Sequence, residues 1–148
     1  MRVNLWFLGL VGVVLSYSAA AAQVTHLNRS GAPSGLPFSE AVRVDDTLYL
    51  SGQVGVLPNS MEVAPGGMEG EARQVMQNIQ AVLQSNGLDL KDVVKCTVML
   101  GDINEWGDFN RVYTSFFEAP YPARSAFTTT GLALGARVEV ECMAAYPD

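Results

Sequence analysis

The sequence contains few of the residues from which most enzyme active sites are built. It has one histidine, His26, and two cysteines, Cys96 and Cys142, with no C-x-x-C motif. Zinc sites use about three or four His, Cys or acidic ligands in close spacing, and no such set is present in the sequence. A nucleophile with a histidine base is disfavoured, because His26 would have to be that base and lies in the lead-in to the domain. The glycine-rich signatures of phosphate and dinucleotide binding are absent.

Basic residues are also scarce. Nine Lys and Arg stand against fifteen Asp and Glu, which gives a net charge of −6. Residues 1–22 contain only one of these charges, Arg2, so the rest of the chain has a net charge near −7. This charge argues against nucleic acids and anionic membrane surfaces as partners. It does not argue against a small anionic ligand, since one local arginine can dominate a pocket.

The N-terminus has the three-part pattern of a secretory signal peptide. Arg2 is followed by an apolar run from Leu5 to Leu15 and then by small residues that end in four alanines. We therefore predict a signal peptide over residues 1–22 and one domain over residues 23–148, exported to the periplasm or secreted. The apolar run is too short to span a bilayer comfortably, although an uncleaved membrane anchor is the alternative. No membrane association is expected after cleavage.

The spacing of apolar residues predicts six strands and two helices. The first helix is the clearest, because its apolar residues follow i, i+3, i+4, i+7 spacing and Asn86-Gly87 ends it. Asp102 and Glu105 predict a capping box for the second helix. In chain order we expect strands over Val24–Leu27, Ala41–Val44 and Thr47–Ser51, a helix over Gly70–Asn86, a strand over Asp92–Leu100, the second helix, and strands over Ala123–Thr129 and Arg137–Tyr146.

Each predicted helix has a single apolar stripe. In the second helix this stripe is aromatic, and two prolines are expected to stop the helix; the residues are Trp106, Phe109, Tyr113, Phe116 and Phe117, then Pro120 and Pro122. One-sided stripes predict an α+β two-layer sandwich, with both helices on one face of a single sheet. In the strand over Asp92–Leu100, alternation assigns Val94 and Cys96 to the helix face and Lys95 to the other. The uncovered face still has apolar side chains, so we expect oligomerisation to bury it.

Two charged positions are candidates for chemistry. Arg124 begins a strand directly after a proline-rich turn, and its planar guanidinium can hold a carboxylate through two parallel hydrogen bonds. A surface arginine or a structural ion pair fits the same pattern. The last strand places Arg137, Glu139 and Glu141 on one face, where a carboxylate could act as a base or orient a water, or belong to a solvated strand face. Both strands form one short β-β unit, which favours a shared site.

Two further features have two interpretations each. Gly52, beside Ser51 at a strand end, permits close approach of another backbone or a ligand, but the segment taken alone fits a bulge or strand terminus better. Cys96 and Cys142 fall on the helix-facing side of their strands, and one interpretation is a pair of buried free thiols that act as small apolar side chains. A disulfide is the alternative, and it requires the two strands to be neighbours in register. Catalytic thiol chemistry is disfavoured, because no activating base is near.

Several segments occur in a recognisable order. They are Leu50–Gln53, the helix through Arg73 to Gly87, Asp92–Val98, Phe109–Tyr113 with Phe116–Phe117, Pro122–Ser125 and Val138–Glu141. Together they resemble the signature segments of the reactive intermediate deaminase family (RidA, YjgF-like). The resemblance extends from about Ser34 to Tyr146. The S-G-Q and P-A-R-S segments and the paired-glutamate strand, in that order, are quite specific.

The resemblance implies a fold, an assembly and a reaction. The fold would be a chorismate-mutase-like α+β sandwich with one mixed sheet, assembled as a homotrimer with a central barrel and clefts between subunits. Members hydrolyse 2-imino acids, or their enamine tautomers, to 2-oxo acids and ammonia without a metal or organic cofactor. The expected partners are therefore a small carboxylate-bearing substrate and further copies of this chain.

The resemblance also assigns residues. Arg124 matches the arginine that clamps the substrate carboxylate, and Glu139 matches the carboxylate that positions or activates the attacking water. Ser51 and Asn110 match polar residues around the cleft. The usual tyrosine of a G-P-Y segment is Phe38 here, which keeps an aromatic wall but lacks a hydroxyl.

A second departure from the family is Ala126, in place of the small or thiol residue two positions after the arginine. The sequence predicts hydrolytic deamination of small 2-imino acids with water as the nucleophile. One alternative is a non-catalytic protein that binds small carboxylates or a partner on the same scaffold. Another is a hydrolase of small amides or carbamates. Retention of Arg124 and Glu139 favours the deaminase over both alternatives, and Phe38 weakens the case for it. An exported protein would not meet imines made by cytosolic pyridoxal-phosphate enzymes.

Overall fold

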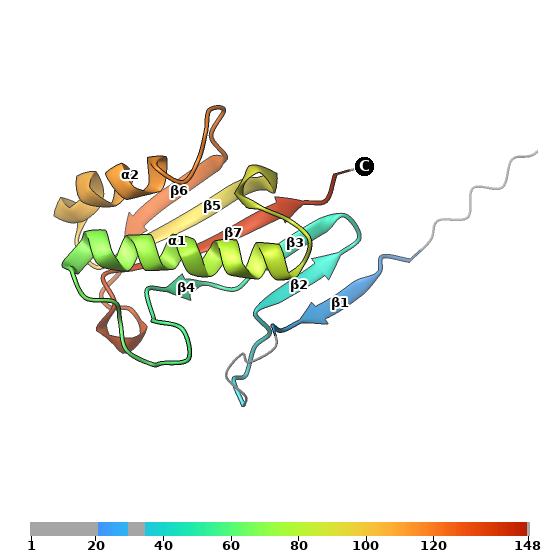
Figure 1. Ribbon diagram of the computed structural model, residues 1–148, viewed down its shortest axis with the longest axis horizontal. Coiled ribbons are helices and arrows are strands. Elements are labelled where there is room, and N and C mark those ends of the chain that lie inside the picture. Colours follow the sequence, from blue (N-terminus) through green and yellow to red (C-terminus); the bar gives the residue numbers. More distant parts are fainter. Residues whose placement is uncertain (1–20, 30–34, 148) are drawn as a thin grey trace, which may run out of the picture.

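A computed structural model describes residues 21–29 and 35–147, and it contains one mixed, seven-stranded sheet (Figure 1). The strands are β1 (Val24–Leu27), β2 (Ala41–Val44), β3 (Thr47–Leu50), β4 (Gln53–Val54), β5 (Val93–Leu100), β6 (Ala123–Thr128) and β7 (Val138–Ala145). The sheet order is β1-β2-β3-β7-β5-β6, with β4 paired beside β7. Among these described strands, the β5–β6 pair alone is parallel. Residues 1–20 of the predicted signal peptide lie outside the described residues.

Both helices cover the same face of the sheet, which confirms the predicted α+β two-layer sandwich (Figure 1). They are α1 (Gly67–Ser85) and α2 (Trp106–Thr114), and short 3-10 turns η1 (Leu90–Asp92), η2 (Ile103–Glu105) and η3 (Ala133–Gly135) lie between elements. Fully buried side chains of α1 pack against those of the central strands; these are Val75, Met76, Ile79, Val82 and Leu83 against Leu48, Val98, Leu100, Val138 and Val140. No helix in the described part of the chain is long and apolar enough to cross a membrane.

The start of α1 differs from the prediction. The helix begins at Gly67 rather than Gly70, because Gly66 adopts a left-handed conformation, with φ of 103°, that turns the chain into the helix. Its predicted end is confirmed. Asn86 is the C-cap residue and Gly87, with φ of 77°, follows it, while the backbone N–H of Leu88 donates to the carbonyl of Leu83.

The start of β5 also differs. The register with β7 shifts between Val93 and Lys95, so that one extra residue is inserted as a bulge. Val93 is therefore buried, and Val94 is 48% exposed instead of facing the helices as predicted. From Cys96 onward the predicted alternation holds, because Cys96, Val98 and Leu100 are all buried.

The predicted capping box before the second helix is only half formed. The Asp102 side chain accepts a hydrogen bond from the backbone N–H of Asn104, but the Glu105 side chain does not accept one from the backbone N–H of Asp102. Its carboxylate instead accepts from Arg137 Nη1 at 2.6 Å. The helix also ends at Thr114, well before the prolines, and the hydroxyls of Thr114 and Ser115 donate to the carbonyls of Asn110 and Val112 in its last turn.

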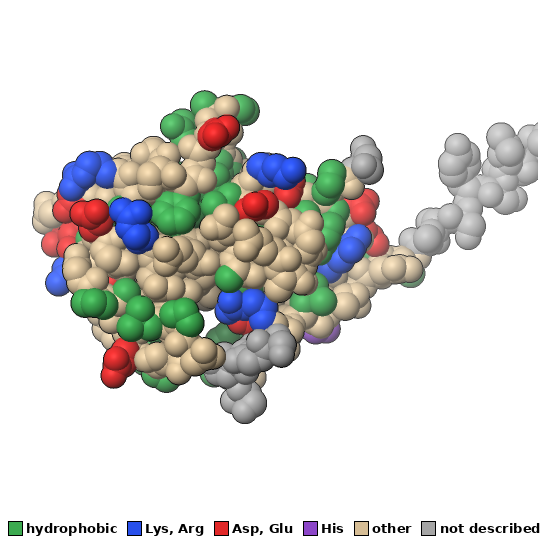
Figure 2. Space-filling view, in the orientation of Figure 1, with side chains coloured by type: hydrophobic (Ala, Val, Ile, Leu, Met, Phe, Trp, Pro, Cys, Tyr) green, Lys and Arg blue, Asp and Glu red, His purple; other side chains and the backbone are tan. Residues whose placement is uncertain are grey.

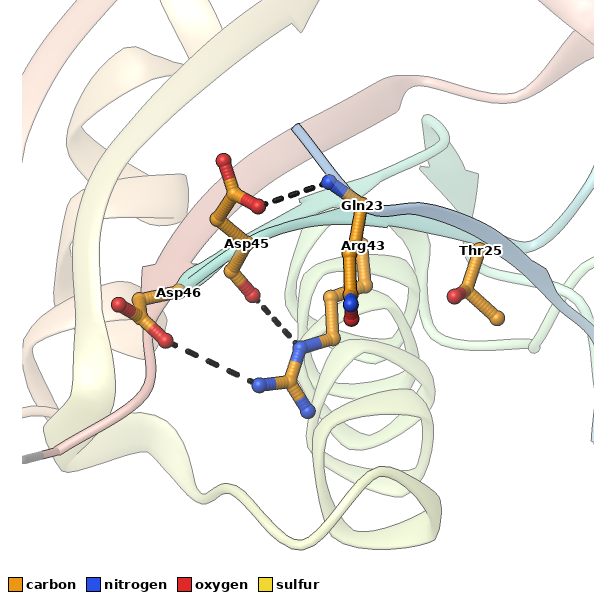
Figure 3. Close-up of a pocket in the computed structure, with 5 residues that line it drawn as sticks. All are labelled: Gln23, Thr25, Arg43, Asp45 and Asp46. Carbon is orange, nitrogen blue, oxygen red and sulfur yellow. Dashed lines mark hydrogen bonds and ion pairs between the residues drawn. The ribbon is translucent and has the colours of Figure 1, made fainter. Parts of the chain in front are cut away.

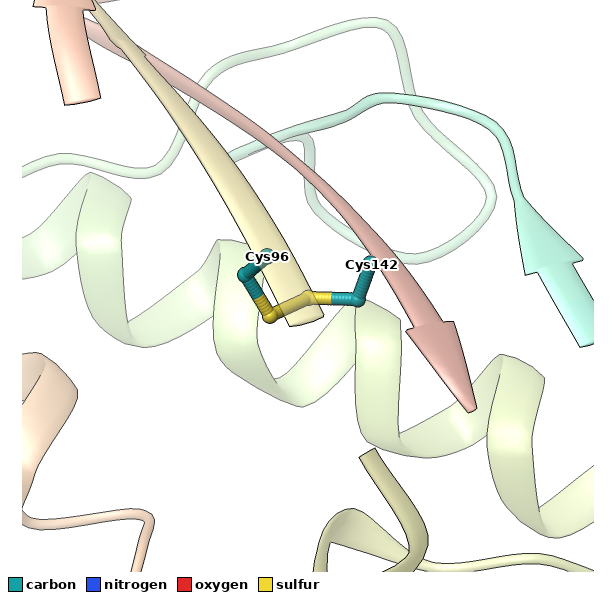
Figure 4. The surroundings of a disulfide bond; sticks show 2 residues. All are labelled: Cys96 and Cys142. Atoms are coloured by element: carbon teal, nitrogen blue, oxygen red, sulfur yellow. A yellow bond between two sulfur atoms is a disulfide. The ribbon is translucent and has the colours of Figure 1, made fainter. Parts of the chain in front are cut away.

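The two cysteines form a disulfide, which decides between the two interpretations that the sequence left open (Figure 4). Cys96 of β5 and Cys142 of β7 are directly opposite each other in the antiparallel register. The bridge lies on the helix face next to α1, and both residues are only 1% exposed. Since the bridged residues are 46 positions apart, the bond shortens the unfolded chain substantially.

We predict that replacing both Cys96 and Cys142 with alanine lowers the free energy of unfolding by about 2–4 kcal/mol, because the unfolded chain gains entropy and the core loses packing. Urea unfolding of the oxidised parent and of the double variant measures the difference. The reduced parent is the matched control, because it has the same side chains without the bond. An unchanged midpoint in the double variant would contradict a stabilising role for the bridge.

The second face of the sheet is not covered by a helix in the described residues. Alternation and strand register place on it Val24, Val42, Tyr49, Met99, Phe127, Glu139, Glu141 and Met143. Val24, Tyr49 and Phe127 are 56%, 43% and 49% exposed in the single chain. We call this surface the open face.

Candidate active site

Arg124 lies on the helix face, over the aromatic side of α2. In the parallel β5–β6 pair it is the partner of Cys96, whose side chain points toward the helices. Its guanidinium carbon is 4.6 Å from the ring centre of Tyr113, and the rings of Trp106 and Phe109 are 5.5 and 5.9 Å away. These distances are typical of cation–π contacts.

Arg124 differs from the other described arginines in its charge partners. Each of the other five forms an ion pair with a carboxylate; they are Arg29, Arg43, Arg73, Arg111 and Arg137. Within residues 21–29 and 35–147, no carboxylate lies within 4.0 Å of Arg124. Its positive charge is therefore not neutralised inside the chain, and its planar N–H fork remains available to a carboxylate.

Two polar atoms on α2 also lack partners. Asn110 Oδ1 and the Tyr113 hydroxyl are buried, and neither forms a hydrogen bond with the described residues. Burial raises the pKa of Tyr113, and the nearby charge of Arg124 offsets only part of this rise. The hydroxyl therefore stays protonated at neutral pH. Unpaired buried polar groups cost about 1–3 kcal/mol each, so this region has hydrogen-bonding capacity that one chain leaves unused.

Glu139 belongs to a separate cluster at the junction of β3, β4 and β7. It is paired with Met99 of β5 and Val54 of β4, and its side chain lies against Gly52. A Cβ atom on Gly52 would overlap Oε1 of Glu139. The group that closely approaches Gly52 in the described residues is therefore the Glu139 side chain, and any side chain at residue 52 would displace its carboxylate.

Ser51 precedes Gly52 in this cluster, and the chain segment that contains Phe38 is hydrogen-bonded to Ser51. The Ser51 hydroxyl donates to the carbonyl of Ser39 at 2.7 Å, and its backbone N–H donates to the carbonyl of Glu40 at 2.9 Å. These bonds hold the segment after Phe38 beside the end of β3. Phe38 itself is 55% exposed.

An ion pair fixes the same segment from the other side. The buried Glu40 carboxylate accepts hydrogen bonds from Nε and Nη2 of the Arg29 side chain and from the Arg29 backbone N–H. Burial alone would raise the pKa of Glu40, but the hydrogen bonds and charge of Arg29 outweigh it and lower the pKa below its usual value. Glu40 is therefore ionised at neutral pH and anchors the start of β2.

The structure does not bring Arg124 and Glu139 together within one chain. Arg124 shares the helix face with Cys96 and Cys142, whereas Glu139 alternates with the buried Val138 and Val140 and lies on the open face. Arg137, predicted on the same face as Glu139, instead pairs with Glu71 and Glu105. The chain thus has two clusters: an arginine cluster of Arg124 and the α2 residues, and a glutamate cluster of Glu139, Gly52 and Ser51.

One open hollow in the described residues lies away from both clusters. It has a volume of about 640 Å³ and is lined by Gln23, Thr25, Arg43, Asp45 and Asp46 (Figure 3). Arg43 is already engaged there, since it donates to the Asp45 carbonyl, pairs with Asp46 and rests over the Tyr146 ring at 3.8 Å. A ligand would have to displace these contacts, so we do not assign a site to this hollow.

Residues 29–146 match the family model described as Endoribonuclease L-PSP. The chain belongs to this family. It is 42% identical over 119 residues to the 2-iminobutanoate/2-iminopropanoate deaminase of Mus musculus, covering 80% of this chain and 88% of the mouse protein. The resemblance to reactive intermediate deaminases is confirmed.

Two solved structures are similar throughout the domain. The crystal structure of RidA from the Antarctic bacterium Psychrobacter sp. PAMC 21119 has a TM-score of 0.72 and 37% identity, covering 76% of this chain and 91% of that one. The crystal structure of E. coli TdcF with bound serine has a TM-score of 0.76 and 29% identity, covering 83% of this chain and 99% of TdcF.

For this member of the endoribonuclease L-PSP family, sequence reasoning missed the contacts that support the two charged residues. Trp106, Phe109 and Tyr113 were assigned only to an apolar stripe, although they also lie around Arg124. Their helical spacing was the available signal. The fit of Glu139 onto Gly52 depends on the pairing of β4 with β7, and the sequence alone does not indicate that pairing.

Proposed function

We propose that the protein hydrolyses small 2-imino acids to 2-oxo acids and ammonia. The observation that supports this most is Arg124, the one described arginine without a carboxylate partner, which presents an unneutralised guanidinium suited to a substrate carboxylate. The names of relatives that are about 40% identical, as deaminases of 2-iminobutanoate and 2-iminopropanoate, support the same substrate class. The serine bound to TdcF supports a small carboxylate-bearing ligand.

In the proposed mechanism, Arg124 fixes the carboxylate and so orients the adjacent C=N bond. Glu139 holds a water against the imine carbon and accepts a proton as the C–O bond forms and the C=N π bond breaks. The carbinolamine nitrogen takes up the proton from Glu139. The C–N bond then breaks as the C=O π bond forms, the hydroxyl proton passes to Glu139, and ammonia leaves the 2-oxo acid. The protonated imine is already electrophilic, so the protein mainly orients and desolvates the reactants.

This mechanism requires the two clusters to meet between subunits. Arg124 and Glu139 lie on opposite faces of one sheet, so an Arg124 from one chain would have to join a Glu139 from its neighbour. The exposed apolar side chains of the open face support an assembly that buries them. We propose a homotrimer with a central barrel and a cleft between each pair of subunits.

For the assembly, we predict a mass three times that of one chain by light scattering at micromolar concentration. The apolar open face supplies the driving force for association. Phe127→Glu, which places a charge on that face, is expected to dissociate the assembly, and Ile103→Glu, at an equally exposed apolar residue outside the sheet, is the matched control. A monomeric or dimeric parent would contradict the trimer.

We also propose that the protein is exported after cleavage between Ala22 and Gln23. The Cys96–Cys142 bridge supports this location, because disulfides persist in oxidising compartments. We predict that intact-mass measurement of the protein from the producing cell gives a chain starting at Gln23. A full-length cytosolic chain starting at Met1 would contradict export. The imine source would then be an amino-acid oxidising reaction in the same compartment.

The decisive experiment is an imine-hydrolysis assay on purified protein, with an amino-acid oxidase and catalase generating the 2-imino acid in situ. The expected result is faster formation of 2-oxo acid than in the oxidase reaction alone. Phe38, which lacks the hydroxyl of the usual tyrosine, favours one competing function, a non-catalytic carboxylate-binding protein. Binding of 2-oxobutanoate without acceleration of imine hydrolysis would support that function instead.

The name of the matched family model also raises ribonuclease activity. The acidic composition of this chain disfavours it, since RNA binding relies on basic surfaces. On the helix-covered side, basic and acidic side chains are interspersed (Figure 2). An RNA-cleavage assay with the same preparation is the direct comparison.

A further inference from the structure

Tyr113 is the aromatic residue closest to the Arg124 guanidinium. The guanidinium carbon is 4.6 Å from its ring centre, compared with 5.5 Å for Trp106 and 5.9 Å for Phe109. The Tyr113 ring is itself held between two others, 5.6 Å from Phe109 and 4.7 Å from Phe117. It is only 3% exposed, so its position is fixed by packing.

A fixed ring face has a specific effect on an arginine. The side chain has several rotatable bonds, and ordering it on ligand binding costs conformational entropy. A carboxylate partner would order it but would also neutralise its charge. An aromatic face attracts the cation and restricts its motion while leaving the outward N–H groups unpaired. Because Tyr113 stays protonated, it adds no negative charge that would compete with a ligand.

We propose that Tyr113 is a positioning residue, whose ring holds the Arg124 guanidinium ready for the substrate carboxylate. This inference rests on the proposed function only in naming the ligand, because the contact itself lies within one chain. It assigns the effect to the ring rather than to the hydroxyl. The aromatic stripe of α2 therefore contributes to binding as well as to the core.

The test uses isothermal titration calorimetry with 2-oxobutanoate to compare the Kd of three variants with that of the parent. Tyr113→Leu removes the ring and is expected to raise Kd by about 3-fold to 30-fold. Tyr113→Phe keeps the ring and is expected to stay within about 2-fold of the parent, the range left by losing a hydroxyl without a partner. Val112→Ala is the matched control: it removes buried packing from the same helix and belongs to none of the ring contacts of Tyr113 or Arg124, so it should lower Tm and leave Kd unchanged.

A second readout needs no ligand. The Nε–H signal of Arg124 in NMR spectra of the free protein should be displaced by the ring and should move toward its ordinary position in Tyr113→Leu only. The proposal is overturned if Tyr113→Leu leaves both Kd and this signal unchanged, if Val112→Ala weakens binding equally, or if Tyr113→Phe weakens binding as much as Tyr113→Leu. Failure of the deaminase function is distinguishable, since it would appear as an inactive parent whose Arg124 signal still responds to Tyr113→Leu.

Discussion

Replacing Arg124 with lysine is expected to lower kcat/KM for a 2-imino acid by roughly 30-fold to several thousand-fold, with the assembly intact. A guanidinium holds a carboxylate through two parallel hydrogen bonds, and an ammonium group holds it as a point charge. The lysine would also rest less well on the flat Tyr113 face, since it lacks a planar group to stack. The measurement is steady-state kinetics with imine generated in situ.

Arg111→Lys is the matched control for this prediction. Arg111 is also an arginine near the α2 surface, but its side chain is 72% exposed and pairs with Asp108. Its replacement should leave kcat/KM within about 2-fold of the parent, because exposed pairs contribute little. Parent-like turnover and affinity in Arg124→Lys would make Arg124 a structural residue and remove the main support for the deaminase.

Replacing Glu139 with glutamine is expected to reduce kcat by about 100-fold to 10,000-fold, with a smaller change in the affinity for 2-oxobutanoate. Glutamine keeps the shape of the side chain and its fit against Gly52, but it cannot accept a proton from the attacking water. The carboxylate clamp is unchanged, so binding should persist. Single-turnover kinetics and product titration separate the two effects.

Glu141→Gln is the matched control, because Glu141 lies on the same strand and the same face but is exposed and two residues further along. It should behave like the parent. If Glu141→Gln lowers kcat as much as Glu139→Gln does, the loss reflects the charge of the strand and not a base at residue 139. If Glu139→Gln has no effect on kcat, the water must be activated by another group.

Local patterns in the sequence predicted most of the elements because each depends on neighbouring residues. The stripe of α1, the Asn86-Gly87 ending and the alternation of β7 are of this kind. The bulge between Val93 and Lys95 was not predictable, since no particular residue type distinguishes an inserted residue in an apolar strand. The disulfide was left open for a different reason. It depends on β5 and β7 being neighbours in register, and they are far apart in sequence.

The candidate site was predicted as a set of residues but not as an arrangement. Arg124 was identified without any sign that it alone among the described arginines lacks a carboxylate, since that depends on where every acidic side chain lies. Its placement on the face opposite Glu139 follows from the parallel pairing of β5 and β6. Strand alternation gives the face of a residue only relative to its own strand, and the register links one strand to the next.

The opposite-face placement of Arg124 and Glu139 has a consequence for inheritance. If each cleft takes its arginine from one copy and its glutamate from another, a defect in either residue is not confined to the chain that carries it. Two alleles, one defective at each position, would complement each other in a cell that makes both, because some mixed trimers would contain a cleft with both intact residues.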